Sequence, residues 1–196
     1  MTQKNFGQLN LITKVYQSPK TVFTTKDLAL LWEDCDIDTL KSKIAYYVKE
    51  GALRRLRRGV FVKKDVYDAK ELATSIYQPS YISFETVLRE AGIIFQHYDT
   101  IFVAAPWSRN ISIDGKKIVY RTMKKGVLYN SAGVLQKGVY SIATPERAFV
   151  DMLYLYPRFY FDNLRALDWE QCLDLAKMYN NKQLLKRIMQ CRAQYV

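Results

Sequence analysis

The stretch that decides the fold is DIDTLKSKIAYYVKEGALRRLRRGVFVKK, residues 36–64, where a helical pattern runs directly into an extended, basic one. Between positions 41 and 64 nine lysines and arginines stand against a single acid, Glu50, so the local net charge is +8. Positive charge at this density predicts a polyanion as the partner of this part of the chain.

Residues 37–50 have the period of an amphipathic helix that Gly51 ends. Its apolar arc consists of Ile37, Leu40, Ile44, Tyr47 and Val48. The opposite arc and its flanks carry Asp38, Thr39, Lys41, Ser42, Lys43, Tyr46 and Lys49. Three carboxylates, those of Asp34, Asp36 and Asp38, surround the start of the helix, and we expect Asp36 or Asp38 to be its N-cap.

The residues after this helix predict a β-hairpin. Leucine, valine and phenylalanine at positions 53, 56 and 60–62 flank Arg57-Arg58-Gly59, and glycine takes the positive φ of a hairpin tip without strain. Two helices are predicted before residue 36. Apolar side chains recur at steps of three and four over residues 3–17, and Thr24 with Asp27 has the spacing of a capping box.

Three helices followed by a basic hairpin is the order of a winged helix-turn-helix, whose third helix enters the major groove of DNA while the hairpin lies along the backbone or minor groove. The residues expected to reach base edges or flanking phosphates are Thr39, Lys41, Ser42, Lys43 and Tyr46. Those expected to displace counterions from phosphates are Arg54, Arg55, Arg57, Arg58 and Lys63.

The second half of the chain predicts a mixture of helices and strands. Asp68 with Glu71, Ser83, and Thr144 followed by Pro145 are predicted to start helices, and two more helices are expected at 168–179 and 182–194. Strands are predicted at IIF (93–95), TIFVAAP (100–106), ISI (111–113), KKIVYRTM (116–123) and VLYN (127–130). Asp114-Gly115 between two of them is a strong hairpin turn.

The predicted fold class is therefore α+β. An N-terminal winged helix-turn-helix is expected over residues 1–67, and a C-terminal mixed α/β domain with a small, mostly antiparallel sheet over residues 68–196.

Four segments together resemble the AbiEi antitoxins of abortive-infection toxin–antitoxin systems. They are the stretch from Thr24 to Trp32, LRRLRRGVFV (53–62), YISFETVLREAGII (81–94) and SIATPERAFVDMLYL (141–155). The resemblance implies a sequence-specific autorepressor that binds inverted repeats in its own operator. It also implies that the C-terminal domain opposes a nucleotidyltransferase-type toxin, without a stable complex being required.

Two alternatives remain open. One is a stand-alone winged-helix repressor without a toxin partner. The other is a metal-dependent DNA nuclease in which Asp99 and Asp114 hold a metal ion, with Lys116 in D-x-K spacing, although Asp114-Gly115 is also explained as a turn. The lone histidine, His97, and the lack of a phosphate-binding loop motif favour a protein that is not an enzyme and needs no cofactor or metal.

Composition predicts a folded, cytoplasmic protein. The 196 residues carry a net charge of +11 and are 49% hydrophobic, with no apolar run long enough to span a membrane and no secretory signal. Cys35, Cys172 and Cys191 are too widely spaced to predict a disulfide framework or a zinc site. We expect a monomer in solution or a dimer on DNA.

Overall fold

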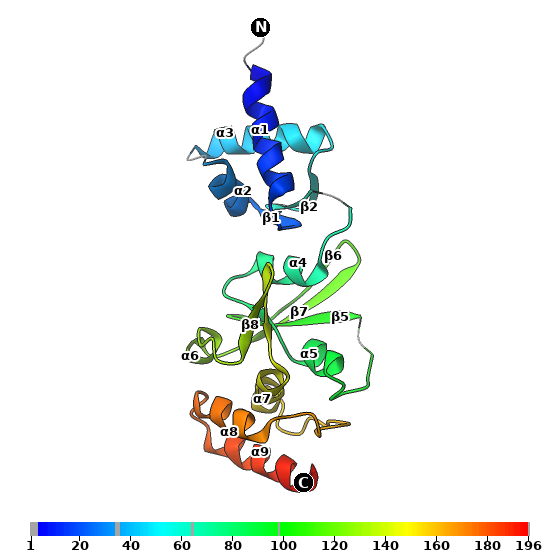
Figure 1. The fold of residues 1–196 in the computed structure, drawn as a ribbon, viewed down its shortest axis with the longest axis vertical. Coiled ribbons are helices and arrows are strands. Elements are labelled where there is room, and N and C mark those ends of the chain that lie inside the picture. Colours follow the sequence, from blue (N-terminus) through cyan, green and yellow to red (C-terminus); the bar gives the residue numbers. More distant parts are fainter. Residues whose placement is uncertain (1–3, 34–35, 64, 98, 196) are drawn as a thin grey trace. The chain divides into compact units, whose positions relative to one another are not determined.

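The computed structural model describes residues 4–33, 36–63, 65–97 and 99–195 (Figure 1). The chain divides into two compact units, Met1–Ile76 and Tyr77–Val196. Each has its own sheet, so the chain is a mixed α/β protein, as the coarse fold class predicted.

The first unit contains four helices among its described residues and a three-stranded sheet. Its elements are α1 (Lys4–Gln17), β1 (Val22–Thr24), α2 (Thr25–Trp32), α3 (Ile37–Lys49), β2 (Arg54–Arg57), β3 (Val60–Val62) and α4 (Ala69–Ile76). The sheet order is β1-β3-β2, and both pairings are antiparallel. A register shift between Arg55 and Arg57 places a bulge at Leu56 in the hairpin.

Local chemistry fixes the ends of these elements. The Thr24 side chain accepts from the Asp27 backbone N–H while the Asp27 carboxylate accepts from the Thr24 N–H, which confirms the predicted capping box. Asp36 is the N-cap of α3, as expected. Gly59 has a φ of 78° at the predicted hairpin tip. Asp34 and Cys35 lie outside the described residues.

The core of the first unit forms where α1, α2 and α3 meet the sheet. Its buried side chains are Val15, Phe23, Leu28, Trp32, Leu40, Ile44, Tyr47, Leu53 and Phe61. Trp32 donates its indole N–H to the Leu11 carbonyl and packs its ring 5.6 Å from that of Tyr47. Ile37 was predicted to join this core, but it is 61% exposed because it begins the helix, beyond the end of the buried stripe.

The first unit ends later than the sequence predicts, after Ile76 rather than after residue 67. The reason is α4, which packs on β1. Asp68 accepts from the backbone N–H of Lys70 and of Glu71, but the Glu71 carboxylate does not return the bond as a capping box requires. It accepts instead from the backbone N–H and hydroxyl of Thr21, and so ties α4 to the start of β1.

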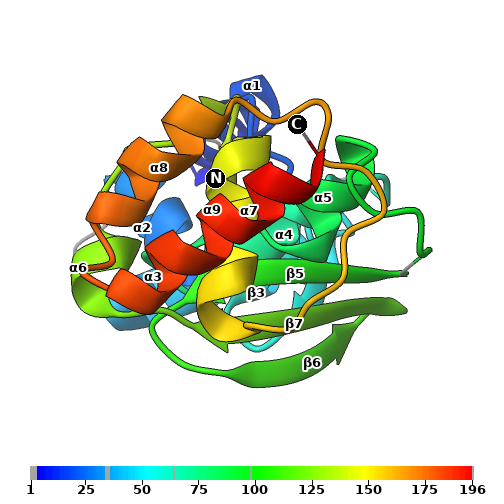
Figure 2. The same ribbon diagram turned by 90° about the horizontal axis from the view of Figure 1, so that it is seen from below.

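The second unit has a six-stranded sheet covered by helices. Its elements are β4 (Tyr81–Ile82), α5 (Glu85–Glu90), β5 (Thr100–Ala105), β6 (Arg109–Ile113), β7 (Lys116–Thr122), α6 (Lys125–Leu128), β8 (Val134–Lys137), β9 (Tyr140–Ala143), α7 (Pro145–Leu155), α8 (Trp169–Lys177) and α9 (Lys182–Tyr195). The strand order is β6-β7-β5-β4-β9-β8. Three of the five pairings are antiparallel, whereas β4–β9 and β5–β7 are parallel, so the sheet is mixed where a small, mostly antiparallel one was predicted. Figure 2 shows α7, α8 and α9 together on one side of the strands.

Helix α7 is the centre of the second unit. Thr144 caps it, Pro145 occupies its first turn, and every residue from Glu146 to Leu153 is buried, as predicted for a central helix. It packs against α5, α8, α9 and β9. The predicted hairpin at Asp114-Gly115 is also confirmed, since both residues have positive φ between β6 and β7.

Three local predictions in this unit were wrong. Residues 93–95 form no strand, and residues 125–128 form α6 where the strand VLYN was expected. Ser83 does not cap α5: it is fully buried and donates its hydroxyl to the Asp151 carboxylate, while Phe84 takes the N-cap position without a side-chain cap. The strands β4, β8 and β9 were not predicted.

Among residues 4–33, 36–63, 65–97 and 99–195, no helix combines the length and the apolar character that a membrane crossing requires.

Candidate nucleic-acid interface

The exposed face of α3 carries five of the predicted contact residues. This face borders an open hollow of about 420 Å³, lined by Asp36, Asp38, Thr39, Ser42, Lys43 and Tyr46. Tyr46 is 41% exposed and leans edge-on against the buried Tyr47, at a ring-centroid distance of 5.3 Å. The buried stripe of α3 thus faces the core while hydroxyl, ammonium and carboxylate groups face solvent.

Several of these polar groups are already engaged with one another. Asp36 accepts from the Thr39 backbone N–H at 2.7 Å, and hydrogen bonds from Thr39 hold the pKa of the Asp36 carboxyl below its usual value. Lys41 pairs with Asp38 at 3.1 Å, and Ser42 donates its hydroxyl to the Asp38 carbonyl at 2.9 Å. One carboxylate therefore caps the helix, and the other partly neutralises Lys41.

The hairpin tip presents three exposed arginines. The guanidinium of Arg55 lies 5.5 Å from the centre of the Phe61 ring, so the Arg55 side chain packs on the sheet. Within the described part of the chain, the guanidinium groups of Arg57 and Arg58 have no hydrogen bond or ion pair. The Gly59 carbonyl accepts from the Thr25 backbone N–H, so the tip is fastened to the first residue of α2. Arg57 and Arg58 are free to meet an external anion.

Arg54 and Lys63, which were also predicted to bind phosphate, have partners inside the unit. Arg54 lies 3.1 Å from the Asp65 carboxylate through its Nε atom. Lys63 donates its ammonium to the Ser18 carbonyl at 2.6 Å, just beyond the C-terminal end of α1, and the Tyr16 hydroxyl donates to the Lys63 carbonyl at 2.8 Å. These contacts hold the hairpin against α1.

We define the α3–hairpin surface as the exposed side of α3 together with Arg55, Arg57 and Arg58. The structure brings eight of the ten predicted residues to α3 or the hairpin tip, and gives Arg54 and Lys63 internal contacts as well. This surface can donate and accept hydrogen bonds along one helix and supply positive charge from the hairpin.

The pair of acids considered for a nuclease lies elsewhere. Asp114 has a φ of 51° in the β6–β7 turn. The Asp99 carboxylate lies 3.0 Å from the Nε2 atom of His97. In the described ranges, no group of three or more histidines, cysteines or acids is arranged to hold a metal ion. Cys172 is buried, which raises the pKa of its thiol, as burial also does for Cys191.

No protein-family model and no curated protein matches this chain. Among solved structures it is similar to the Rv2827c protein of Mycobacterium tuberculosis, with 12% sequence identity and a TM-score of 0.47. The match covers 97% of this chain and 82% of the mycobacterial one. A likeness at that level establishes neither a fold nor a function.

The second unit holds a buried polar cluster that sequence analysis missed. Arg147 and Asp151, one turn apart on α7, are both completely buried and pair at 3.3 Å. Asp151 also accepts from the hydroxyls of Tyr81, Ser83 and Tyr179. Arg147 donates to the Tyr81 hydroxyl and to the carbonyls of residues 127, 130 and 132.

Charge in this cluster is set by burial and pairing. Complete burial raises the pKa of the Asp151 carboxyl, whereas Arg147 and the three hydroxyl donors oppose that rise. Burial also raises the pKa of the Tyr81 and Tyr179 hydroxyls well above the usual value, so both remain protonated donors. Space is equally constrained, because a side chain at Gly133 would approach the Arg147 Cβ to 2.8 Å.

The cluster joins β4, α7, the α6 region and the end of α8, and therefore fixes the geometry of the second unit. The pattern that indicates it in the sequence is Arg147 and Asp151 at i and i+4 in a helix that is apolar from Ala148 onward apart from Asp151.

Proposed function

We propose that the chain is a sequence-specific DNA-binding transcription regulator whose first unit acts as a winged helix-turn-helix. In this proposal α3 enters the major groove and the β2–β3 hairpin lies along the flanking backbone or minor groove. The order of α1, α2, α3 and the hairpin supports it. An α-helix is about 10–12 Å across with its side chains and so fits a major groove about 12 Å wide, and the 13 residues of α3 make it about 20 Å long.

The observation that carries the proposal is a pair of arginines at the hairpin tip whose guanidinium groups have no partner in the described part of the chain, in the same unit as a helix with exposed hydrogen-bonding side chains. Arg57 and Arg58 are available to replace counterions on phosphates or to enter a narrow minor groove. On α3, Ser42 and Tyr46 offer hydroxyl groups, and Lys43 offers a cation, for base edges and phosphates. Charge for affinity and polar groups for selectivity thus lie on separate elements.

We further propose that the protein is an antitoxin of the AbiEi type, which represses its own operon through inverted repeats in double-stranded DNA and opposes a nucleotidyltransferase toxin. This proposal rests on the resemblance of the segments 81–94 and 141–155. Those segments contain Tyr81 and Ser83, and Arg147 and Asp151, which are members of the buried cluster. The polar residues in these two segments therefore have a structural role in the second unit, as members of the buried cluster. In this function the protein is not an enzyme.

A binding assay on the DNA upstream of the protein's own gene tests the regulator proposal. We expect a labelled upstream fragment to be retarded intact, with and without magnesium, and a random fragment of the same length to bind more weakly. Magnesium-dependent cutting that disappears in Asp114→Ala would overturn the proposal in favour of a nuclease. Equal affinity for both fragments would remove its sequence specificity.

Coexpression with the adjacent gene tests the antitoxin proposal separately. We expect the adjacent gene alone to arrest growth and this chain to restore it, including a variant with Arg57→Ala and Arg58→Ala when both genes are expressed from foreign promoters. If the adjacent gene is harmless by itself, the chain is a stand-alone repressor.

A further inference from the structure

Two loops of the second unit bring exposed aromatic side chains to the surface. We define the aromatic loop surface as Phe95, Tyr156, Arg158, Phe159 and Tyr160. Phe95 is 70% exposed, Tyr160 is 77% exposed and Tyr156 is 42% exposed. Large aromatic side chains gathered at solvent are typical of surfaces that bind another molecule.

The two loops are tied to each other, so their exposure is a fixed feature of the unit. The Phe95 backbone N–H donates to the Asp162 carboxylate at 2.8 Å. The backbone N–H groups of Asp162 and Asn163 both donate to the Ile93 carbonyl, at 3.0 and 3.1 Å. Such cross-links lower the conformational entropy that a partner would otherwise have to remove on binding.

Inner contacts anchor the same loops. Phe159 packs 5.0 Å from Phe161, which in turn packs 4.9 Å from Phe149 of the buried helix α7. Tyr156 stacks 4.7 Å from the guanidinium of Arg121, whose charge is paired with Glu85.

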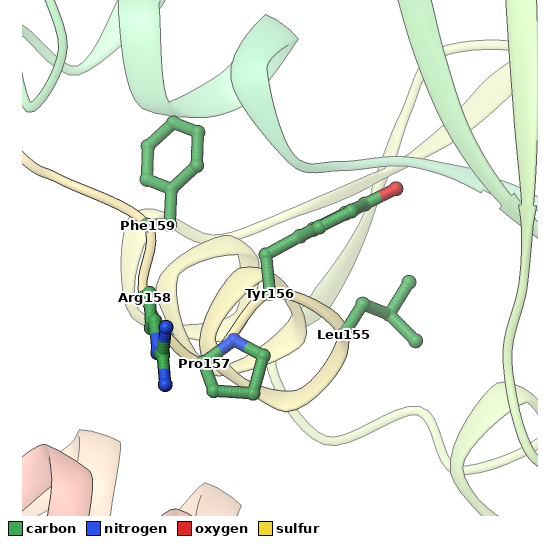
Figure 3. Close-up of a pocket in the computed structure, with 5 residues that line it drawn as sticks. All are labelled: Leu155, Tyr156, Pro157, Arg158 and Phe159. Atoms are coloured by element: carbon green, nitrogen blue, oxygen red, sulfur yellow. The ribbon is translucent and has the colours of Figure 1, made fainter.

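Residues 155–159 line a hollow of about 450 Å³. Figure 3 shows Tyr156 and Phe159 directed to one side of the loop, and Pro157 and Arg158 directed to the other. The walls are mainly apolar, and the hollow is large enough to accept a bulky side chain.

The segment that carries this surface, residues 155–165, has a net positive charge, with Arg158 and Arg165 against Asp162. Within the described ranges the guanidinium groups of Arg158 and Arg165 make no hydrogen bond or ion pair. Asp162 is the only acid between positions 155 and 165, and its carboxylate already accepts from Phe95. An incoming acidic group therefore finds two unpaired cations and one carboxylate that is already engaged.

We propose that the aromatic loop surface docks a second protein, through a segment in which an apolar or aromatic side chain is flanked by aspartate or glutamate. The apolar side chain fills the hollow at 155–159, and the carboxylates pair with Arg158 and Arg165. Tyrosine and arginine are among the residue types that concentrate binding energy in protein interfaces, and phenylalanine is enriched there.

A protein partner suits this surface better than single-stranded nucleic acid. Stacking of bases requires a groove whose cations follow the backbone, whereas this stretch has only the two arginines. Between positions 41 and 64, by contrast, nine basic residues occur. The docking proposal does not depend on the DNA-binding function of the first unit.

Selection from a displayed library of random 12-residue peptides on the full chain tests the proposal. We expect enriched peptides to share an apolar or aromatic residue flanked by acids. A synthetic copy, followed by fluorescence anisotropy, should bind about tenfold or more weakly to a variant with Arg158→Glu and Tyr160→Ala. The matched control, Lys137→Glu with Tyr129→Ala, changes an exposed cation and an exposed tyrosine elsewhere in the same unit and should bind normally.

Several results would overturn the docking surface. They are enrichment of no peptide, enrichment of peptides without acids, and equal binding by the two variants. Loss of binding to a labelled single-stranded oligothymidine in the Arg158 and Tyr160 variant would indicate nucleic acid instead. A dimer in sedimentation that this variant dissociates would indicate a second copy of the chain. If the double variant unfolds at a lower temperature than the control, Arg158→Gln alone is used for the same comparison.

Discussion

At the level of single residues, the hairpin divides its basic side chains into two kinds. Arg57 and Arg58 have no partner within the described part of the chain, whereas Lys63 is bound by the Ser18 carbonyl just beyond the end of α1. The first kind is available to an external anion, which is DNA in the proposed function, and the second holds the first unit together.

We expect Arg57→Ala with Arg58→Ala to weaken binding to all DNA sequences and to lower the slope of log affinity against log salt concentration by roughly 1–2, since each lost phosphate contact removes about 0.9. Binding titrations over a range of salt concentrations measure this slope. Lys182→Ala with Lys186→Ala, two exposed cations of α9, provides a control whose slope should not change. An unchanged slope in the arginine variant would mean that the hairpin does not touch DNA.

The buried pair on α7 leads to a prediction about stability. Arg147→Met leaves the Asp151 carboxylate buried without its cation and should lower the free energy of unfolding by about 3–5 kcal/mol. The matched change Arg192→Met breaks an exposed pair with Glu170 and should cost about 0–1 kcal/mol. Urea unfolding of both variants makes the comparison. Similar losses in the two variants would show that the buried pair is not a structural centre.

Sequence patterns identify single residues well when the partner is close in the chain. The capping pair Thr24 and Asp27 was predicted correctly because both bonds lie within one turn. Ser83 was misassigned as a cap because its actual partner, Asp151, is 68 positions away. The buried cluster around Arg147 was not predicted for the same reason, because Arg147 and its partner Tyr81 are 66 positions apart.

At the level of elements, α3 separates a buried stripe from a polar face. Leu40, Ile44 and Tyr47 pack into the core, which leaves Ser42 and Tyr46 exposed at the hollow. The packing of the opposite face holds the backbone that carries these side chains, which would support the proposed role of α3 in reading base edges.

Replacing Ser42 or Tyr46 by alanine should therefore alter the preference among binding sites more than the overall affinity. We expect changes in relative affinity equivalent to about 1–3 kcal/mol at one or two base positions. Binding to a set of operator variants, each with one base pair changed, measures the effect. Equal losses on specific and random DNA would count against α3 as the reader.

The start of α2 gives a pH dependence. Burial alone raises the pKa of the Asp27 carboxyl, but hydrogen bonds from Lys20 and Thr24 outweigh it and hold the pKa below the usual value of 3.8. The ionised carboxylate therefore stabilises the fold above the unfolded-state pKa, and this contribution is lost as the pH falls through the lower folded-state pKa.

Accordingly, the difference in unfolding free energy between the unchanged chain and Asp27→Asn should be largest near neutral pH and should shrink below about pH 4. Chemical unfolding of both proteins across this range provides the measurement. A difference that grows on acidification would contradict the assigned bonds.

Elements were predicted best where their amphipathic or turn pattern is local. The positive φ of Gly59 and Gly115 followed directly from their turns. The strands expected at 93–95 and 127–130 failed because a short apolar run does not distinguish a strand from a buried loop or a helical turn. Ile93, Ile94, Val127 and Leu128 are buried in the second unit, and only the tertiary fold determines that burial.

At the level of the whole molecule, the two units divide after Ile76. The boundary predicted after residue 67 fell short because nothing local indicates that the Glu71 carboxylate reaches Thr21, 50 positions earlier. Helix α4 is part of the first unit for that reason.

A fragment comprising residues 1–76 should therefore be more stable than one comprising residues 1–67. Loss of α4 leaves the Thr21 hydroxyl and backbone N–H without their acceptor and uncovers β1. We expect a difference in unfolding free energy of about 1–3 kcal/mol from the unsatisfied groups alone. Thermal melting of the two fragments, with Glu71→Gln in the longer one as an intermediate case, tests this. Identical melting curves would place the boundary at residue 67.

The chain has three tryptophans, and Trp32 alone belongs to the first unit, where it packs on Tyr47 of α3 and donates to Leu11. Trp169 packs against Phe149 in the second unit. Each unit thus carries a tryptophan packed against an aromatic core residue, buried in the first unit and half-buried in the second. With Trp107 and Trp169 replaced by phenylalanine, the emission of Trp32 would report the α3 environment directly, and its shift on addition of an operator would follow DNA engagement in real time without any attached dye.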